Sequence, residues 1–322
     1  MVEAPRSLSS AGKAPAPRRQ ATPSSALSSR ELGLDLALIL ARYLCKTDHL
    51  HYGYWSSDMS IELANLKEAQ ERYTDLLVSH IPEGVESILE VGIGSGALTH
   101  RLIQAGYRVD CVSPSPYLTA RARELLGDGP QIFECRYEDL QTPNRYDLIL
   151  FSESFQYVRL DKAISISEAH VCPEGYVLIS DFFRKETTED GPIKGGHRLH
   201  EMHRLLETCT LRLMTDRDIT DQTAPNLDLL NDFSQRVIVP VKERLFGFLA
   251  QKYPLPYRAL YGMLRKHLRH AETKYLSGQR NGAAFRKYKT YRVLLFQQGC
   301  PGSAAAAPPR LVAQSVGAGA DG

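Results

Sequence analysis

The chain has 322 residues, of which 43% are hydrophobic and 24% are charged. This composition is that of a globular protein and excludes a collagen-like, a fully disordered or a multi-span membrane protein. No run approaches the roughly 18 apolar residues of a membrane span. The net charge of +2 conceals an asymmetry, because residues 242–292 hold 13 Lys or Arg against two Glu. Such a segment fits an anionic substrate, a membrane surface, nucleic acid, or simply the solvated faces of helices.

The two ends of the chain differ in composition from the middle. Residues 1–30 contain seven Ser and four Pro without an apolar period, and residues 300–322 are rich in Ala, Gly and Pro. We expect both tails to be disordered. The first tail is also rich in Arg and poor in acid, so organelle targeting is an alternative to the cytoplasmic location that we expect. With no signal peptide and no C-x-x-C pair, the six cysteines predict reduced thiols.

The middle of the chain alternates between two kinds of apolar pattern. Helices are predicted at 31–45 and 65–80; strands at 87–92, 107–113, 131–136, 146–152 and 176–183; and further helices at 97–106 and 117–127. This alternation predicts an α/β fold with a mainly parallel sheet covered by helices on both faces. Residues 188–285 are expected to be mostly helical, with a short strand or turn at 216–220 and a helix kink or break at Pro240. One more strand is predicted at 290–297.

The strongest local signal is the glycine-rich turn after the first strand. The stretch Ile88–Ala97 reads ILEVGIGSGA, a buried strand that runs into a glycine loop and then a helix. Glycines let the backbone approach a ligand closely, and the helix N-terminus offers free N–H groups to an anionic group. By itself the loop therefore indicates a nucleotide-like cofactor.

Two cofactor classes compete for this loop. Gly92, Gly94 and Ala97 satisfy the G-x-G-x-x-G/A pattern of dinucleotide-binding proteins, whereas Glu90 followed by three alternating glycines satisfies E-x-G-x-G-x-G. A dinucleotide fold places an acid about 20 residues later to grip the ribose. Asp110 lies inside the second strand, and the tip of that strand is Ser113. This disfavours a dinucleotide-dependent oxidoreductase.

Further motifs carry a resemblance to a known family. These motifs are His51-Tyr52-Gly53-Tyr54-Trp55, Leu66-Lys67-Glu68-Ala69-Gln70, Val112-Ser113-Pro114-Ser115-Pro116, Arg136-Tyr137-Glu138-Asp139-Leu140 and Ser152-Glu153-Ser154-Phe155-Gln156-Tyr157. Over about 240 positions the chain resembles the class I S-adenosylmethionine-dependent methyltransferases. It is most similar to the small-molecule and lipid branch, which includes tocopherol, glycine/sarcosine and cyclopropane-fatty-acid enzymes. Arg136, Tyr157 and Glu174 depart from the pattern of that branch.

The resemblance implies a Rossmann-like sheet with an antiparallel last strand. It divides the chain into a tail (1–30), a helical N-terminal lid (31–85), a cofactor-binding core (86–185), a helical substrate cap (186–289), the last core strand (290–299) and a second tail (300–322). The implied cofactor is S-adenosyl-L-methionine, and the implied reaction is in-line methyl transfer to a small-molecule or lipid-like acceptor. Proximity, alignment and exclusion of water are the protein's main contributions to such a reaction.

The same resemblance assigns residues to the cofactor. The expected contacts are Glu90 with the amino group, the loop glycines Gly92, Gly94 and Gly96, and Ser113 and Ser115 with the ribose hydroxyls, together with Arg136, Tyr137 and Ser152. Each has a structural alternative. Glu90 can cap the next turn, and either serine can cap the helix at 117–127.

The acceptor side is predicted from the ends of strands four and five and from the lid. Tyr52, Tyr54 and Trp55 offer aromatic faces and hydroxyls to a sulfonium and to the methyl group in transfer. Gln156, Tyr157 and Asp181 lie at the carboxyl edge of the sheet, where ligands bind in open α/β sheets. We expect Tyr54, Gln156, Tyr157 and His197 to be catalytic, and Tyr52, Trp55 and Asp181 to contact substrate.

Several alternatives remain open at this point. His197, His200 and His203 recur every three residues, but no Cys or Asp cluster joins them, so we expect no metal. A nucleic-acid methyltransferase would use the basic segment at 242–292, yet strand four is not followed by N-P-P-Y or D-P-P-Y, and we find no RNA-binding module. A non-catalytic relative that only binds the cofactor is the other alternative. Contact with a membrane surface stays open.

Overall fold

The computed structural model describes residues 29–187 and 191–299. The tail predictions at 1–28 and 300–322 lie outside these ranges. A seven-stranded sheet with the order β3-β2-β1-β4-β5-β7-β6 forms the centre. The strands are β1 (Ser87–Val91), β2 (Arg108–Val112), β3 (Ile132–Phe133), β4 (Tyr146–Ser152), β5 (Val171–Arg184), β6 (Leu211–Asp218) and β7 (Lys289–Gln298). The first five strands run parallel, and β7 is antiparallel to both β5 and β6.

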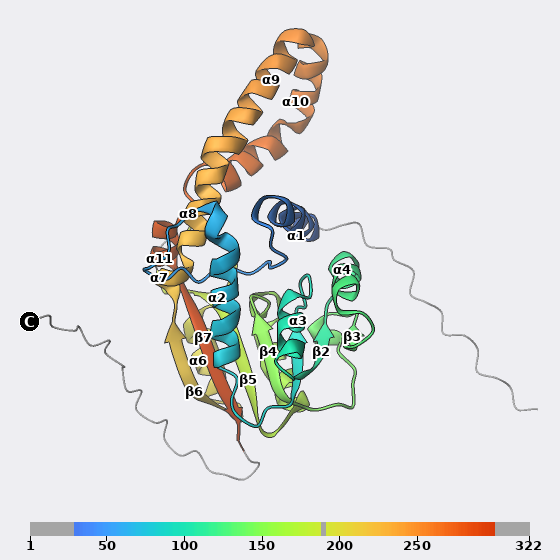
Figure 1. Cartoon of the computed structure of the whole chain (residues 1–322). Helices are drawn as coiled ribbons and strands as arrows, with labels where there is room; N and C mark the ends of the chain where they lie inside the picture. Colours follow the sequence, from blue (N-terminus) through green and yellow to red (C-terminus); the bar gives the residue numbers. More distant parts are fainter. Residues whose placement is uncertain (1–28, 188–190, 300–322) are drawn as a thin grey trace, which may run out of the picture.

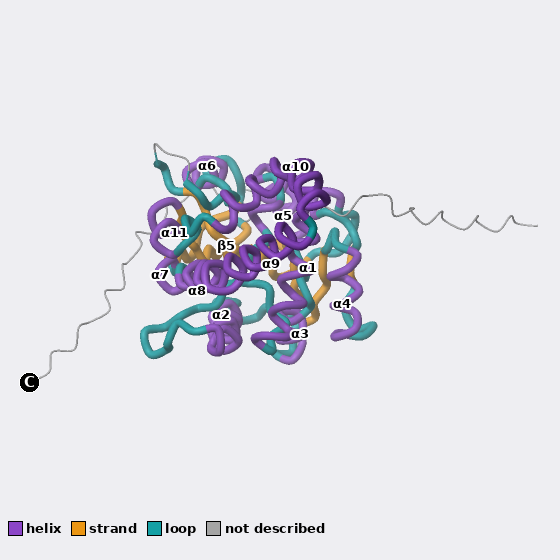
Figure 2. Tube along the Cα trace, turned by 90° about the horizontal axis from the view of Figure 1, so that it is seen from above, coloured by secondary structure: helices purple, strands orange, loops and turns teal. Residues whose placement is uncertain are grey.

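Helices cover both faces of this sheet, as Figures 1 and 2 show. The helices are α1 (Ser29–Leu40), α2 (Leu66–Ser79), α3 (Ala97–Gln104), α4 (Pro116–Leu126), α5 (Leu160–His170), α6 (Leu199–Leu206), α7 (Thr220–Thr223), α8 (Pro225–Phe233), α9 (Val239–Lys252), α10 (Pro254–Ala271) and α11 (Gly282–Tyr288). One apolar cluster joins α2, α3 and α11 to Ile88, Leu148 and Leu150. The other joins α5 and α6 to Leu89 and Ile149. Successive strand residues thus supply opposite cores, as a two-period strand requires.

The α/β fold and the mainly parallel sheet are confirmed, and one strand corrects the expectation for the cap. Residues 211–218 form the full edge strand β6 inside a region that we expected to be mostly helical, with only a short strand or turn at 216–220. The pattern is weak because an edge strand keeps one face and one side in water and carries charges there. Arg292 of β7 lies 2.6 Å from Asp216 and 2.8 Å from Asp218, which ties the edge to the sheet.

The kink or break expected at Pro240 has a counterpart in a change of helix type. A π-helical segment, Ser234–Ile238, separates α8 from α9, and Pro240 lies in the first turn of α9. Phe233, Ile238 and Val239 keep helical backbone angles, so the helix continues through this segment, and Pro240 lacks the N–H that the turn before it could have bonded. Beyond it, α9 and α10 form a hairpin that projects away from the sheet (Figure 1). Among the described residues, no helix is both long enough and apolar enough to cross a membrane.

Candidate active site

The glycine loop joins β1 to α3 at the carboxyl edge of the sheet. The Gly92 N–H donates to the Val112 carbonyl at 2.8 Å, and the Gly96 carbonyl accepts from His100 N–H at 2.8 Å in the first turn of α3. Gly94 has a φ of +56°, which L side chains rarely adopt. A Cβ placed on Gly94 would find its nearest neighbour, Leu50 Cδ1, only at 3.9 Å. The backbone of Gly94 therefore borders open space that a side chain would fill.

Glu90 lies beneath this loop on the α3 side of the sheet. Its side chain is buried, and Thr99 Oγ1 donates to its Oε2 at 2.6 Å. Burial raises the pKa of the Glu90 carboxyl to about 8, although the Thr99 hydroxyl opposes the shift. An ammonium group would reverse this shift by favouring the carboxylate. Glu90 is thus suited to hold the amino group of a cofactor.

The other predicted cofactor residues lie along the edge at β2, β3 and β4. Ser113 and Ser115 are buried, and Ser115 Oγ caps α4 by accepting from Leu118 N–H at 3.3 Å. The Tyr137 side chain packs into the core, with its hydroxyl 3.0 Å from Ser167 Oγ, and Arg136 beside it is exposed. Ser152 Oγ is 3.4 Å from the Tyr73 hydroxyl. Ser115 Oγ accepts a bond as a helix cap but keeps its own proton, which it can donate to a ligand. Because the Tyr137 ring is buried, a ligand can reach this residue only at its backbone.

The predicted lid lies over the loop and is fastened at several points. Ser95 Oγ of the loop donates to the Asp48 carbonyl. Gln70 Nε2 donates to the carbonyls of His49, at 3.2 Å, and His51, at 2.7 Å. At the far end of the segment, Asn226 Oδ1 accepts from Gly53 N–H at 2.8 Å. Two amides from distant helices therefore hold residues 47–55 against the carboxyl edge.

The three lid aromatics differ in what they leave accessible. Trp55 is only 4% exposed, and its indole N–H donates to Asn226 Oδ1 at 3.2 Å. The Tyr54 hydroxyl accepts from Arg217 at 3.4 Å. The Tyr52 ring stacks on Phe182 with centroids 6.5 Å apart, beside the apolar core. Tyr52 is therefore the lid aromatic nearest the ends of β5 and β7, whereas the Trp55 indole is engaged in holding the lid.

Glu153, to which the sequence analysis assigned no role, occupies the centre of this edge. It follows β4 with a φ of +54°, in the left-handed region, and its N–H donates to the Ser180 carbonyl at 2.8 Å. Its Oε1 accepts from Tyr52 N–H at 2.7 Å and from the Tyr291 hydroxyl at 2.8 Å. Burial raises the pKa of the Glu153 carboxyl to about 8, and the nearby Asp181 charge adds to the shift. No cation is among the residues that contact it in the described chain.

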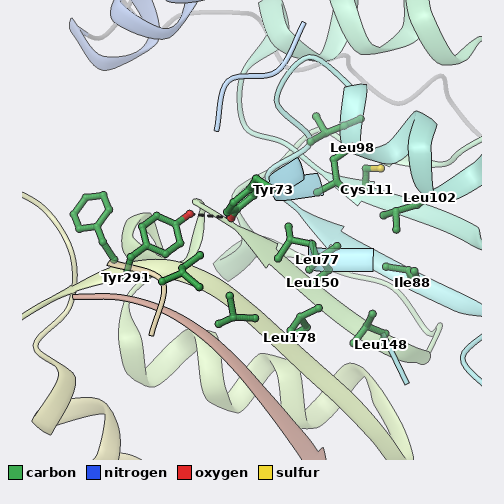
Figure 3. Close-up of a cluster of buried hydrophobic side chains, with 14 of the residues drawn as sticks. Tyr73, Leu77, Ile88, Leu98, Leu102, Cys111, Leu148, Leu150, Leu178 and Tyr291 are labelled. Carbon is green, nitrogen blue, oxygen red and sulfur yellow. Dashed lines mark hydrogen bonds between the residues drawn. The ribbon is translucent and has the colours of Figure 1, made fainter. Parts of the chain in front are cut away.

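A row of hydroxyls continues from Glu153 into the core. The Tyr291 and Tyr73 hydroxyls point toward one another at 2.8 Å, as Figure 3 shows. The Tyr73 hydroxyl also donates to Ser180 Oγ at 2.7 Å. The pKa of both phenols is raised by burial, so both stay neutral at physiological pH. Because these hydroxyls are neutral, the row can orient the Glu153 carboxyl without placing another charge beside it.

The residues expected to be catalytic or to bind substrate after strands four and five form a second group. Asp181 accepts from Gln156 N–H at 2.9 Å and from Gln156 Nε2 at 3.2 Å, and burial raises the pKa of Asp181 to about 7. His197 Nε2 lies 3.1 Å from the Phe155 carbonyl and 2.9 Å from that of Val158, so this nitrogen carries the proton and donates. Tyr157 is 49% exposed. His197 thus fastens a loop, and its Nε2 is not free to accept a proton.

A basic cavity of about 530 Å³ lies next to this group, between the end of β5 and the start of β7. Arg184, Lys185, Arg198 and Lys289 line it, and Lys289 is 1% exposed with its ammonium over the Phe182 ring. Burial, together with the Arg184 and Lys194 charges, lowers the pKa of Lys289 to about 8. The cavity can receive an anionic group.

The sequence analysis gave no site role to three key residues, and they differ in how visible they are in the sequence. Glu153 stands inside the motif after strand four, so its position was visible but its role was not. Tyr73 falls on an ordinary apolar helix face, and Tyr291 lies in the last strand with no motif around it. Only the sheet topology brings Tyr73, Glu153 and Tyr291 together.

Comparison with known proteins identifies the class. A family model described as a methyltransferase domain matches residues 89–179. An uncharacterised methyltransferase of Bacillus cytotoxicus is 29% identical over 142 residues, which are 41% of this chain and 67% of that protein. Two solved structures share the fold at 16% identity. The [4+2]-cyclase SpnF has a TM-score of 0.58 over 84% of this chain and 94% of its own, and a geranyl diphosphate C-methyltransferase from Streptomyces coelicolor has 0.57 over 81% and 92%.

A methyltransferase domain therefore spans residues 89–179, and S-adenosylmethionine is the cofactor that the sequence analysis expects for it. Its residues fit that cofactor on two observations, the open space beside Gly94 and the buried Glu90 carboxyl with a single hydroxyl donor. Bound there, the cofactor supplies an electrophilic methyl group on a positively charged sulfur.

We expect Gly94→Val to abolish S-adenosylmethionine binding, because the side chain fills the space beside the loop. The matched control is Gly106→Val at the other end of α3, where φ is +97° and a Cβ meets nothing within 4 Å. Both variants carry the same kind of backbone strain. Calorimetric titration should show at least a 100-fold loss for the first variant only. Equal affinities in the two variants would show that the loop does not hold the cofactor.

The stability of the empty protein should fall as pH rises from about 6.5 to about 7.5. In this window the unfolded chain has ionised Glu90, Glu153 and Asp181, whereas their raised pKa values, about 8, about 8 and about 7, keep them partly protonated in the folded protein. The folded state therefore binds more protons, and unfolding is favoured by higher pH. Thermal unfolding at constant ionic strength measures the slope, which Glu153→Gln should flatten. A Tm that rises across the window would contradict the assignment.

Proposed function

We propose that this methyltransferase acts on a small-molecule or lipid-like acceptor whose attacking atom loses a proton, and that Glu153 accepts that proton. The observation that carries the proposal is the Glu153 carboxyl at the carboxyl end of β4. It is held by two neutral donors and has a pKa of about 8. A base with a pKa near the working pH is well matched to proton transfer.

The division of labour follows from the two carboxyls at this edge. Glu90 lies under the glycine loop and would hold the cofactor's amino group, whereas Glu153 lies beside Tyr52 and Tyr291 and faces the acceptor side. The cofactor held there would supply the methyl group, and its sulfur would keep the electron pair of the carbon–sulfur bond that breaks. Glu153 would take the proton that the acceptor atom loses as its bond to the methyl carbon forms.

The remaining residues orient the acceptor and exclude water. Tyr52, with Phe182 and Phe285 beside it, offers an apolar wall, and Gln156 is held in place by Asp181. The basic cavity lined by Arg184 and Lys289 would bind a carboxylate or phosphate group of the acceptor. These features support an acceptor with an apolar body and an anionic end.

Radiolabelled methyl transfer from S-adenosylmethionine tests this proposal. The acceptor panel consists of phenols, amines, hydroxy acids, prenyl phosphates and lipid acids. We expect Glu153→Gln to lower kcat about 100-fold or more, because an amide cannot accept the proton. Cofactor affinity should stay unchanged, because Gln keeps an oxygen for Tyr52 N–H and Tyr291 O–H. The wild-type kcat should rise with pH through about pH 8, where Glu153 is half ionised, and level off above it.

The reciprocal variant is the control. Glu90→Gln should weaken cofactor binding, and at saturating cofactor its turnover should stay closer to that of the wild type. Wild-type turnover in the Glu153→Gln variant would show that Glu153 is not the proton acceptor. A wild-type protein that binds the cofactor and transfers no methyl group to any class in the panel would instead favour a cofactor-binding relative without methyltransferase activity.

A further inference from the structure

The hairpin of α9 and α10 contributes little to the core of the protein. No residue of α9 is buried, and the hairpin extends well beyond the helices that cover the sheet (Figure 1). The two helices contact each other through aromatic rings, with Phe246 and Tyr257 centroids 6.2 Å apart. At the base, Lys242 pairs with Glu272 at 2.9 Å. The exposed surface of the hairpin is therefore available to a binding partner outside the chain.

Large apolar side chains on the hairpin are exposed in rows. On α9 they are Val241, Leu245 and Phe248, each more than 50% exposed, at spacings of four and three residues that form one stripe. On α10 the row is Leu260, Met263 and Leu264, and Tyr253 and Leu255 are exposed at the joint. Single exposed apolar residues need no explanation, but contiguous rows mark an interaction surface.

Helix α1 and the π-turn after it, the π-helical segment Ala41–Cys45, carry a similar stripe. Its exposed members are Leu32, Leu36, Ile39, Leu40, Tyr43 and Leu44. Figures 1 and 2 place α1 close to the hairpin, at the same end of the molecule. This is also the end where the glycine loop lies, because Ser95 of the loop contacts Asp48, which follows the π-turn. Two apolar stripes therefore flank the edge that holds the active site.

The charge of the hairpin indicates what it meets. Residues 239–271 contain seven Lys or Arg against the single acid Glu243. A second copy of the chain would bring two such hairpins together, and their like charges would repel each other. A nucleic acid would match the charge, but it would leave the apolar stripes without a partner. An amphipathic helix with apolar residues on one face and Lys or Arg on the rest is the pattern of a segment that lies in the interface of an anionic bilayer.

We propose that the α9–α10 hairpin and the α1 stripe dock together on the surface of an anionic lipid bilayer. Phe248, Leu255 and Met263 enter the acyl boundary, and basic side chains such as Arg258 and Arg265 meet lipid phosphates. Docking holds the carboxyl edge of the sheet toward the lipid. The inference concerns where the enzyme works and does not depend on which acceptor atom is methylated.

Co-sedimentation with vesicles tests the proposal on the full chain. The probes are vesicles of phosphatidylcholine alone and vesicles with about one third phosphatidylglycerol, at low and high salt. We expect binding to the anionic vesicles, at least tenfold weaker binding to the neutral ones, and loss of most binding at high salt. Phe248→Glu and Met263→Glu should each weaken binding at least tenfold, and Arg258→Gln combined with Arg265→Gln should reduce the preference for anionic lipid.

The matched control is Leu125→Glu, which places the same charge on an exposed leucine of α4, outside both stripes. It should bind vesicles like the wild type. Unchanged calorimetric binding of S-adenosylmethionine in every variant verifies the fold, since Met263 is 76% exposed and lies outside the core. Absence of vesicle binding, or equal binding to neutral and anionic vesicles at all salt concentrations, would overturn the proposal. So would a dimer in sedimentation velocity that Phe248→Glu dissolves, because it would make the stripe an interface between copies.

Discussion

The arrangement of the candidate active site depends on one buried carboxyl group, that of Glu153. Its backbone adopts a left-handed conformation that costs a residue other than glycine about 1 kcal/mol or more. Its side chain is desolvated as well, so two unfavourable terms meet at one residue. They are offset by contacts from three distant parts of the chain, namely Ser180 of β5, Tyr52 of the lid and Tyr291 of β7. A strained, desolvated acid that so many elements converge to hold is typical of a functional position.

The same edge holds two further buried carboxyls, and their surroundings separate their roles. Glu90 has one hydroxyl donor and lies under a loop with open space beside Gly94, so a cationic group that enters there would ionise it. Glu153 has two neutral donors, which orient it, and no cation contacts it within residues 29–187 and 191–299. Asp181 accepts two bonds from Gln156 and one from Phe182, so it is occupied in shaping the loop after β4. Their environments, more than their residue types, thus separate the roles proposed for them, which are cofactor partner, proton acceptor and positioning group.

The sequence was sufficient for the repeating part of the fold and insufficient for the site's centre, for physical reasons. A buried parallel strand followed by a glycine turn and a helix leaves a local signature, so β1, α3 and the loop at Gly92–Gly96 could be placed from residues alone. The edge strand β6 left almost none, because half of its side chains face water. Glu153, Tyr73 and Tyr291 meet only after the sheet has formed, and no spacing along the chain encodes that meeting. At His197 the glycine pair beside it suggested a base, and the sequence could not show that Nε2 donates to the carbonyls of Phe155 and Val158.

The position of the hairpin connects the chemistry with the surface of the molecule. In a parallel sheet, the carboxyl ends of the strands gather the loops that bind ligands, and here the lid, the glycine loop and Glu153 all lie at that edge. The exposed stripes of α1, α9 and α10 are at the same end (Figure 1). A soluble acceptor would gain nothing from exposed apolar stripes at this end of the molecule, and their exposure in water lowers solubility. The bilayer docking proposed above would account for that cost, because the apolar side chains are exposed at the same end of the molecule as the candidate site.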